Sequence, residues 1–146
     1  MQIIIYDKAQ QVTQSAALWV KELINKKSNP VLGLATGSTP ISLYKVLVEM
    51  HKDNGLSFAN VTTFNLDEYH HINPANPQSY RSFMTEHLFK NVDIDVNKTY
   101  LPSCELGENP RIQGLAYEQK IKQAGGIDLQ ILGIGANGHI GFNEPT

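Results

Sequence analysis

The 146-residue sequence predicts an α/β fold, with a mostly parallel sheet and helices on both faces. Short apolar segments of strand length alternate along the chain with longer segments whose apolar residues recur at helical spacing. This alternation is typical of strand–helix–strand units, in which neighbouring strands run parallel. A hydrophobic content of 41% is enough for a buried core, so we expect residues 1–146 to form a single domain.

The first half of the chain carries clear helix boundaries. Asp7 with Gln10 forms a variant capping box, Pro40 suits the first position of a helix, and Gly55 suits the position after its end. The expected elements are strands at residues 2–6, 31–35 and 61–66 and helices at residues 8–27 and 40–54. The apolar face expected for the first helix consists of Val12, Ala16, Trp19, Leu23 and Ile24.

The second half continues the pattern. A helix is expected from residue 77 to residue 88, and a short strand at residues 99–101. Residues 111–124 read as a helix that Gly125 and Gly126 end, and residues 127–134 as another apolar strand.

Composition excludes several classes of protein. A net charge of -2 gives no field that would attract nucleic acid or an anionic membrane, so we expect neither as a partner. Cys104 is the only cysteine, which rules out an internal disulfide and a thiolate metal cluster and fits a reducing cytoplasm. The first residues carry no basic segment and too short an apolar run for a signal peptide, and no run is long enough to span a membrane.

Three polar clusters follow directly after expected strands. In a parallel sheet the carboxyl ends of the strands lie at one edge, and ligands bind beyond that edge. The clusters at residues 36–39, 67–69 and 135–144 are therefore expected to meet around one ligand.

The first cluster reads as a phosphate loop. Gly37 allows the backbone to approach a ligand closely, and the hydroxyls of Thr36, Ser38 and Thr39 can donate hydrogen bonds. A helix begins immediately afterwards, and its free N–H groups favour an anion. It is not a Walker loop, because no Gly-Lys-Ser/Thr follows. The alternative is an ordinary turn that Thr39 caps.

The second cluster contains the adjacent carboxylates Asp67 and Glu68. Mutual repulsion can raise one pKa toward that of a usable base, and a carboxylate suits proton transfer between sugar carbons. The alternative is a solvated acidic turn. His70 and His71 are a poor chelating pair, since adjacent side chains of an extended segment point in opposite directions, so we expect no metal site here.

The third cluster centres on His139, a group whose free pKa of about 6.5 suits proton transfer. Glu144 could hold the imidazole in one tautomer. The segment formally contains G-x-G-x-x-G, but Gly141 and Pro145 make the helix that a dinucleotide site needs improbable. The alternative is a structural histidine in a glycine-rich loop.

Together these clusters resemble the glucosamine-6-phosphate deaminase family. The residues that carry the resemblance are 33–40 (GLATGSTP), 65–69 (NLDEY) and 138–145 (GHIGFNEP). Each motif alone is moderately specific, whereas the three in this order are highly specific. The resemblance implies a Rossmann-like fold shared with 6-phosphogluconolactonases. It also implies conversion of glucosamine 6-phosphate and water to fructose 6-phosphate and ammonia, without a cofactor.

The resemblance also implies roles for single residues. Thr36, Gly37, Ser38 and Thr39 would bind the substrate phosphate, with Glu68 as a supporting substrate-site residue. Asp67 would carry a proton between C2 and C1 of the sugar. His139, oriented by Glu144 and assisted by Asn137, would act in opening the sugar ring.

The sequence departs from the family in two respects. Many members have an aspartate where this chain has Asn137, so His139 should be less strongly biased toward its protonated form than in those relatives. Members also exceed 200 residues, so we expect an N-terminal fragment that lacks further strands and phosphate-binding cations. The oligomeric state stays open.

Two rival functions share some of these features. A 6-phosphogluconolactonase has the fold and a similar phosphate loop, but residues 66–69 and 142–145 look like the deaminase versions. A non-catalytic sugar-phosphate sensor would need the loop but neither Asp67 nor His139.

Overall fold

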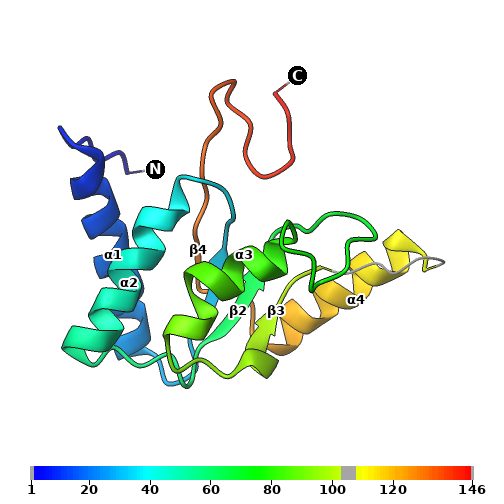
Figure 1. Ribbon diagram of the computed structural model, residues 1–146, viewed down its shortest axis with the longest axis horizontal. Coiled ribbons are helices and arrows are strands. Elements are labelled where there is room, and N and C mark those ends of the chain that lie inside the picture. Colours follow the sequence, from blue (N-terminus) through cyan, green and yellow to red (C-terminus); the bar gives the residue numbers. More distant parts are fainter. Residues whose placement is uncertain (1, 103–107, 146) are drawn as a thin grey trace.

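The computed structural model describes residues 2–102 and 108–145, and its sheet confirms the predicted α/β fold (Figure 1). All strand pairings are parallel, in the order β3-β2-β1-β4. The strands are β1 (Val31–Leu34), β2 (Thr62–Asn65), β3 (Thr99–Tyr100) and β4 (Leu129–Gln130). The helices are α1 (Ala9–Lys26), α2 (Pro40–Asn54), α3 (Tyr80–His87) and α4 (Pro110–Gln123), with single turns η1 (Phe89–Asn91) and η2 (Val96–Lys98). Cys104 lies outside the described residues.

The main core lies between one face of the sheet and helices α1, α2 and α3. Leu32 and Leu34 of β1 supply the sheet side of this core. The buried helix residues that meet them are Ala17, Val20, Leu43, Tyr44, Leu47 and Met84. Burial of this apolar set is the dominant stabilising contribution to such a fold.

Helix α4 covers the opposite face. Phe64 of β2 stacks on Tyr100 of β3 at 4.9 Å and meets Tyr117 of α4 edge-on at 5.7 Å. Gly33 lies beside Phe64 in the strand register. Successive strand residues point to opposite faces, so this aromatic group lies on the side away from Leu32 and Leu34. The prediction of helices on both faces is confirmed.

The predicted strand at residues 2–6 is wrong. These residues form no strand, and Ile3 and Ile5 are 72% and 88% exposed. The Tyr6 hydroxyl donates to Ser15 Oγ of α1 at 2.9 Å. A strand requires a neighbouring strand to satisfy its backbone groups, and no described segment lies beside this one.

The details of α1 also differ from the prediction. The helix is capped one residue later, because the Lys8 N–H donates to Gln11 Oε1 at 3.0 Å in place of the expected Asp7–Gln10 pair. Ala17 and Val20 are buried, whereas Val12 and Trp19 are each 51% exposed. The apolar face is therefore rotated from the predicted one, toward the residues that meet α2.

Two further boundaries moved. The helix expected from residue 77 begins at Tyr80, because the Ser79 side chain accepts a hydrogen bond from the Ser82 N–H and so caps it. The strand expected at residues 127–134 pairs only as far as Ile131, whose N–H donates to Gly33 O at 2.8 Å. Beyond it β1 ends and the chain leaves the sheet, so no described strand is left to pair with.

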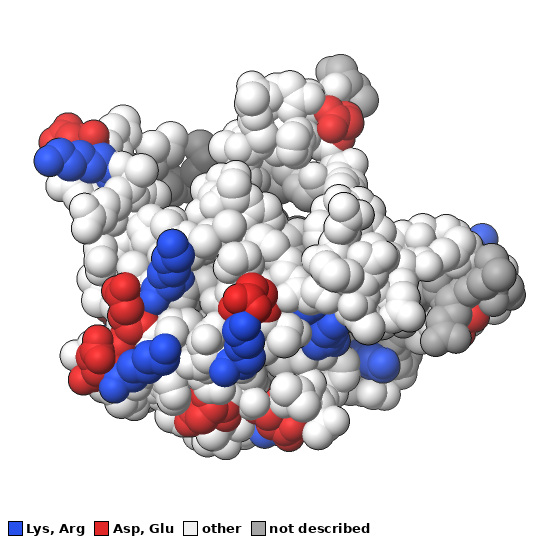
Figure 2. Space-filling view, viewed as in Figure 1, with Lys and Arg blue, Asp and Glu red and all other residues white. Residues whose placement is uncertain are grey.

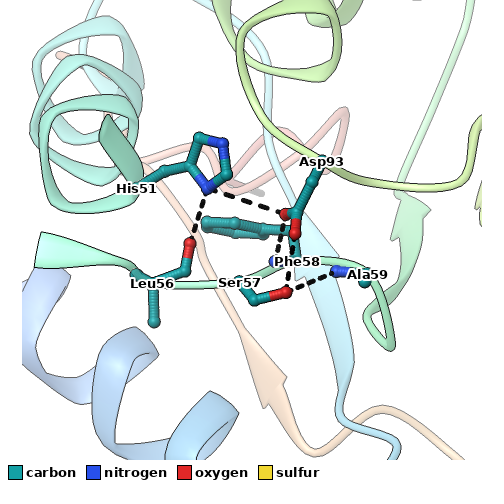
Figure 3. Close-up of polar contacts among 6 residues, drawn as sticks. All are labelled: His51, Leu56, Ser57, Phe58, Ala59 and Asp93. Atoms are coloured by element: carbon teal, nitrogen blue, oxygen red, sulfur yellow. Dashed lines mark hydrogen bonds and ion pairs between the residues drawn. The ribbon is translucent and has the colours of Figure 1, made fainter. Parts of the chain in front are cut away.

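A polar cluster ties loops together at the amino ends of the strands (Figure 3). The Asp93 carboxylate accepts hydrogen bonds from Ser57 Oγ at 2.6 Å and from the Phe58 N–H at 2.5 Å. His51 Nδ1 donates to Leu56 O at 2.7 Å and lies 3.6 Å from Asp93. Ser57 bonds to the carboxylate and not to the imidazole, so the cluster lacks the nucleophile–base pair of a hydrolytic triad.

Candidate active site

The three predicted clusters line one cleft of about 260 Å³ at the carboxyl ends of β1, β2 and β4. Residues 36–39 lie on one side, Asp67 lies at the end of β2, and His139 enters from the loop after β4. The other lining residues include Tyr80, Leu66, Gly133, Gly135, Gly141 and Phe142. The sequence-based expectation that these clusters meet in space is therefore confirmed.

The loop at residues 36–39 turns directly into α2. Gly37 adopts a φ of +110°, a conformation that other residues rarely take. Thr39 occupies the N-cap position but its side chain makes no capping hydrogen bond, and Pro40 is the first helical residue. The amino end of α2 thus lacks a side-chain acceptor from Thr39, which leaves it available to an anion in the cleft.

The cleft has little positive charge of its own. Among the described residues that line it there is no Lys or Arg. Figure 2 shows Lys and Arg mixed with Asp and Glu over the lower part of one face, with no broad area of one sign. A phosphate here would be held by hydroxyl and backbone donors and by the helix terminus.

Two tyrosines support the strand ends beneath the cleft. The Tyr44 hydroxyl of α2 donates to Ala35 O, directly after β1. The Tyr117 hydroxyl of α4 donates to Asn65 O at 2.7 Å and to Tyr100 O at 3.1 Å. Burial raises the pKa of both hydroxyls, so they stay protonated and act as donors. Tyr44 therefore holds the end of β1 from one face of the sheet, and Tyr117 holds the ends of β2 and β3 from the opposite face.

Asp67 is a partly buried carboxylate that lines the cleft. Its pKa lies above the ordinary value, first because of desolvation and second because of the negative charge of Glu68. The predicted repulsion between the two carboxylates is present, but burial is the larger cause. A raised pKa brings a carboxylate closer to the range in which it is an effective general base.

Glu68 lies outside the cleft lining. Its Oε1 accepts hydrogen bonds from the N–H groups of Tyr69 and Tyr80, and its Oε2 accepts one from the N–H of Arg81, each at 2.9 Å. Asp67 and Glu68 thus serve different sides of the chain, as expected for neighbours in an extended segment.

His139 is the end of a three-residue chain of hydrogen bonds. Its Nδ1 lies 2.6 Å from Asn137 Oδ1, and Asn137 Nδ2 donates to Glu144 Oε2 at 2.6 Å. An amide oxygen only accepts, so Nδ1 carries the proton and Nε2 is the free base in the neutral ring. Glu144 Oε1 lies 3.8 Å from Nδ1, so Glu144 reaches the imidazole through Asn137, and its role in setting the tautomer stays a prediction.

Gly135 leaves space for the imidazole ring of His139. A Cβ added at Gly135 would lie 2.1 Å from His139 Cε1, closer than any real contact. The Gly135 N–H also donates to His139 O at 2.8 Å, which closes the loop. Glycine at this position therefore allows the ring to lie directly against the backbone.

Sequence reasoning missed Tyr80 and Phe142 as cleft residues. Their rings stack at 6.4 Å, and the Tyr80 ring also lies 4.7 Å from that of Tyr69. Burial first, and then the hydrogen bond with Tyr69, raise the pKa of Tyr80 to about 12. Tyr80 opens a helix 13 residues after Asp67, and no motif in the sequence marks it as a site residue.

His70 and His71 follow Asp67 but do not line the cleft. The expectation that their side chains point in opposite directions is wrong, because the ring centroids lie 3.6 Å apart; His71 has a φ of 58°, so the segment is not extended there. Over residues 2–102 and 108–145, no group of three or more His, Cys, Asp or Glu side chains is arranged as a metal site.

The sequence profile of the family described as "Glucosamine-6-phosphate isomerases/6-phosphogluconolactonase" matches residues 6–141. The chain belongs to this family. It is 73% identical over 146 residues to a glucosamine-6-phosphate deaminase of Colwellia psychrerythraea, and 55% identical to one of Pseudoalteromonas translucida. These alignments cover 100% of this chain and 54% of each relative, so the chain spans about half the length of the curated relatives it matches.

Solved structures within the family show the same fold. A monomeric glucosamine-6-phosphate deaminase superposes with a TM-score of 0.93 at 38% identity, covering 99% of this chain and 60% of that one. A 6-phosphogluconolactonase of Thermotoga maritima superposes with a TM-score of 0.74 at 21% identity, covering 97% of this chain and 62% of that one. The second likeness concerns the fold alone. No helix in the described part of the chain is long and apolar enough to cross a membrane.

Proposed function

We propose that this protein is a glucosamine-6-phosphate deaminase, which converts glucosamine 6-phosphate and water to fructose 6-phosphate and ammonia. The observation that carries the proposal is that Asp67 and His139 line one cleft beside a hydroxyl-rich turn at a helix terminus. The 73% identity to a deaminase over the whole chain supports the same activity. The sugar phosphate would lie with its phosphate at residues 36–39.

His139 would act first. Its Nδ1–H is engaged by Asn137, so Nε2 can take the proton of the C1 hydroxyl while the C1–O5 bond breaks, and can then deliver that proton to O5. The product of this step is the open-chain amino aldehyde. Glu144 and Asn137 keep the ring in the required tautomer, as a carboxylate does behind other catalytic histidines.

Asp67 then moves a proton between carbons. Its carboxylate removes the C2 proton, which gives an enolate across C1 and C2 that still carries the amino group at C2. Return of that proton to C1, with an amino proton passing to the C1 oxygen, gives an imine at C2. Water adds to C2 and ammonia leaves, so the carbonyl of the ketose forms at that carbon. The raised pKa of Asp67 suits both directions of this transfer.

The direct test is turnover by the full-length protein with two substrates. Ammonia release from glucosamine 6-phosphate is expected, with hydrolysis of 6-phosphogluconolactone at background. The reverse result would assign the lactonase function, and binding of the sugar phosphate without turnover of either would assign a sensor. We also propose a cytoplasmic location, because a single cysteine in the sequence fits a reducing compartment. Cell fractionation tests it.

A further inference from the structure

The backbone amides at the start of α3 are fully accounted for, and Glu68 supplies most of the acceptors. The first N–H groups of a helix have no intrahelical partner. Those of Tyr80 and Arg81 donate to the two oxygens of Glu68 at 2.9 Å. The next, of Ser82, donates to Ser79 Oγ at 3.0 Å. A residue from the end of β2 therefore completes the cap of a helix that begins 12 positions later.

This cap determines what reaches the cleft. Tyr80, whose N–H donates to Glu68, also places its ring in the cleft lining beside Asp67. Arg81 points the other way, where its guanidinium donates to Thr99 Oγ1 at 2.7 Å and to Thr99 O at 2.8 Å. The helix is thus fixed to β2 by Glu68 and to β3 by Arg81.

Glu68 itself lies outside the cleft lining and is bound to the backbone. Both carboxylate oxygens accept backbone N–H bonds, and the hollow that Glu68 lines faces α4, with Pro110, Gln113 and Tyr117. Its alternative role as a direct substrate ligand would require breaking charge-assisted bonds that satisfy a helix terminus.

We propose that Glu68 is a positioning residue that joins the end of β2 to the first turn of α3 and so sets the separation of Asp67 and Tyr80 across the cleft. For its effect on catalysis this inference rests on the proposed deaminase function. Glu68 has a second, electrostatic consequence for Asp67. After desolvation, the charge of Glu68 is the next cause that raises the pKa of Asp67.

The other titratable groups around Asp67 do not replace this charge. Tyr80 from α3 and Tyr117 from α4 interact electrostatically with Asp67, and both stay neutral because their own pKa values are raised. His139, from the loop after β4, also lines the cleft. Removal of the Glu68 charge should therefore shift the ionisation of Asp67 to lower pH.

Two variants separate position from charge in the full-length protein. Glu68→Gln keeps the side-chain length but loses the charge, and its amide NH₂ would meet a backbone N–H of α3 that needs an acceptor. Glu68→Asp keeps the charge but is too short to reach α3. Both are expected to lower kcat on the order of 10²-fold, the effect of roughly 1 Å of misplacement. Only Glu68→Gln should move the acidic limb of the kcat/KM profile to lower pH.

The matched control is Glu86→Gln, on the same helix but in an exposed pair with Lys90, and it should match the wild type. Circular dichroism confirms that each variant is folded at the assay temperature. The proposal is overturned if folded Glu68→Gln retains wild-type kcat and pH profile, or if its loss only follows the unfolded fraction. It is also overturned if Glu68→Asp has the same kcat as the wild type.

A readout independent of turnover separates this inference from the proposed function. Amide hydrogen exchange at Tyr80 and Arg81 should be faster in Glu68→Gln than in the wild type and unchanged in Glu86→Gln. If the wild type releases no ammonia, the deaminase proposal fails, and amide exchange alone tests the positioning role of Glu68. Unchanged exchange at both amides would refute that role.

Discussion

Asp67 is held in a place where its charge opposes folding. Its pKa is higher in the folded chain than in the unfolded chain, because of desolvation and then because of Glu68. Protonation is therefore favoured by folding, and above that pKa the ionised carboxylate lowers the free energy of unfolding. A general base in a cleft must be ionised despite this loss of stability. A substitution of Asp67 can therefore lower activity without lowering stability.

We expect Asp67→Asn to lose activity without losing stability. Removal of the base should lower ammonia release by about 10²- to 10⁴-fold, while binding of the sugar phosphate persists. At pH 7.5 the melting temperature should equal or exceed that of the wild type, and the difference should shrink as pH falls and Asp67 protonates. Thermal unfolding at several pH values measures this. A lower melting temperature at pH 7.5 would contradict the assigned cost.

Gly135 is expected to control the His139 ring by shape alone. Gly135→Ala would place a methyl group 2.1 Å from His139 Cε1, and the backbone there is not left-handed, so the strain falls on the imidazole. Displacement of the ring should lower kcat by roughly 10- to 100-fold with little change in stability. Kinetics and the His139 NMR signals report on it. Gly114→Ala, in open space on α4, is the control, and equal kcat in both variants would disprove the contact.

At the residue scale, the sequence predicted the ionisable residues of the cleft and missed a residue that reaches the cleft through the placement of its helix. Asp67 and His139 were found because each follows a strand and carries an ionisable group. Tyr80 was missed because it reaches the cleft through the placement of α3, which depends on a hydrogen bond to Glu68. Such a long-range bond leaves no pattern in a single sequence.

At the element scale, strands were predicted well where a partner exists. Residues 31–34 and 62–65 form paired central strands, within the ranges predicted from the sequence. Residues 2–6 and 132–134 have equally apolar sequences but find no described neighbour, so they form no strand. Composition reports a segment's suitability for a sheet, whereas a strand exists only when its hydrogen bonds are made.

The polar cluster around Asp93 is expected to stabilise the joined loops at the amino ends of the strands (Figure 3). Partial burial alone would raise the pKa of Asp93, but bonds from Ser57 and Phe58 and the nearness of His51 outweigh it, so the pKa is lowered. The resulting stabilisation is present above the unfolded pKa of about 3.9 and is lost as pH falls through the folded pKa.

Asp93→Asn should therefore lower the free energy of unfolding by about 1 kcal/mol near pH 7, a modest value because the carboxylate is 40% exposed. Urea unfolding from pH 7 to pH 3 measures the difference, which should shrink toward the acid end. Asp53→Asn, at an exposed site of α2, serves as the control. A difference that grows on acidification would contradict the assignment, as would a loss of activity, since the cluster lies away from the cleft.

At the scale of the whole molecule, the sheet and the cleft both have an open side. β4 pairs with β1 and has no second neighbour among the described strands. Leu132 and Ile134, just beyond it, are 51% and 75% exposed. An uncovered edge with exposed apolar side chains favours pairing between chains. The described cleft lining also provides no Lys or Arg for a phosphate, in a chain that spans 54% of its Colwellia relative.

We therefore expect a polypeptide of these 146 residues alone to self-associate and to turn over poorly. Its ammonia release should be at least about 10²-fold below that of the Colwellia relative, because charged phosphate contacts typically supply transition-state and binding energy that neutral donors do not. Analytical ultracentrifugation should detect oligomers. Ile134→Lys should reduce them, because a charge beside an open edge opposes pairing, whereas Val96→Lys, at a 64% exposed site on η2, should not. A monomeric polypeptide with turnover equal to that of the relative would show that neither the edge nor the cleft requires further chain.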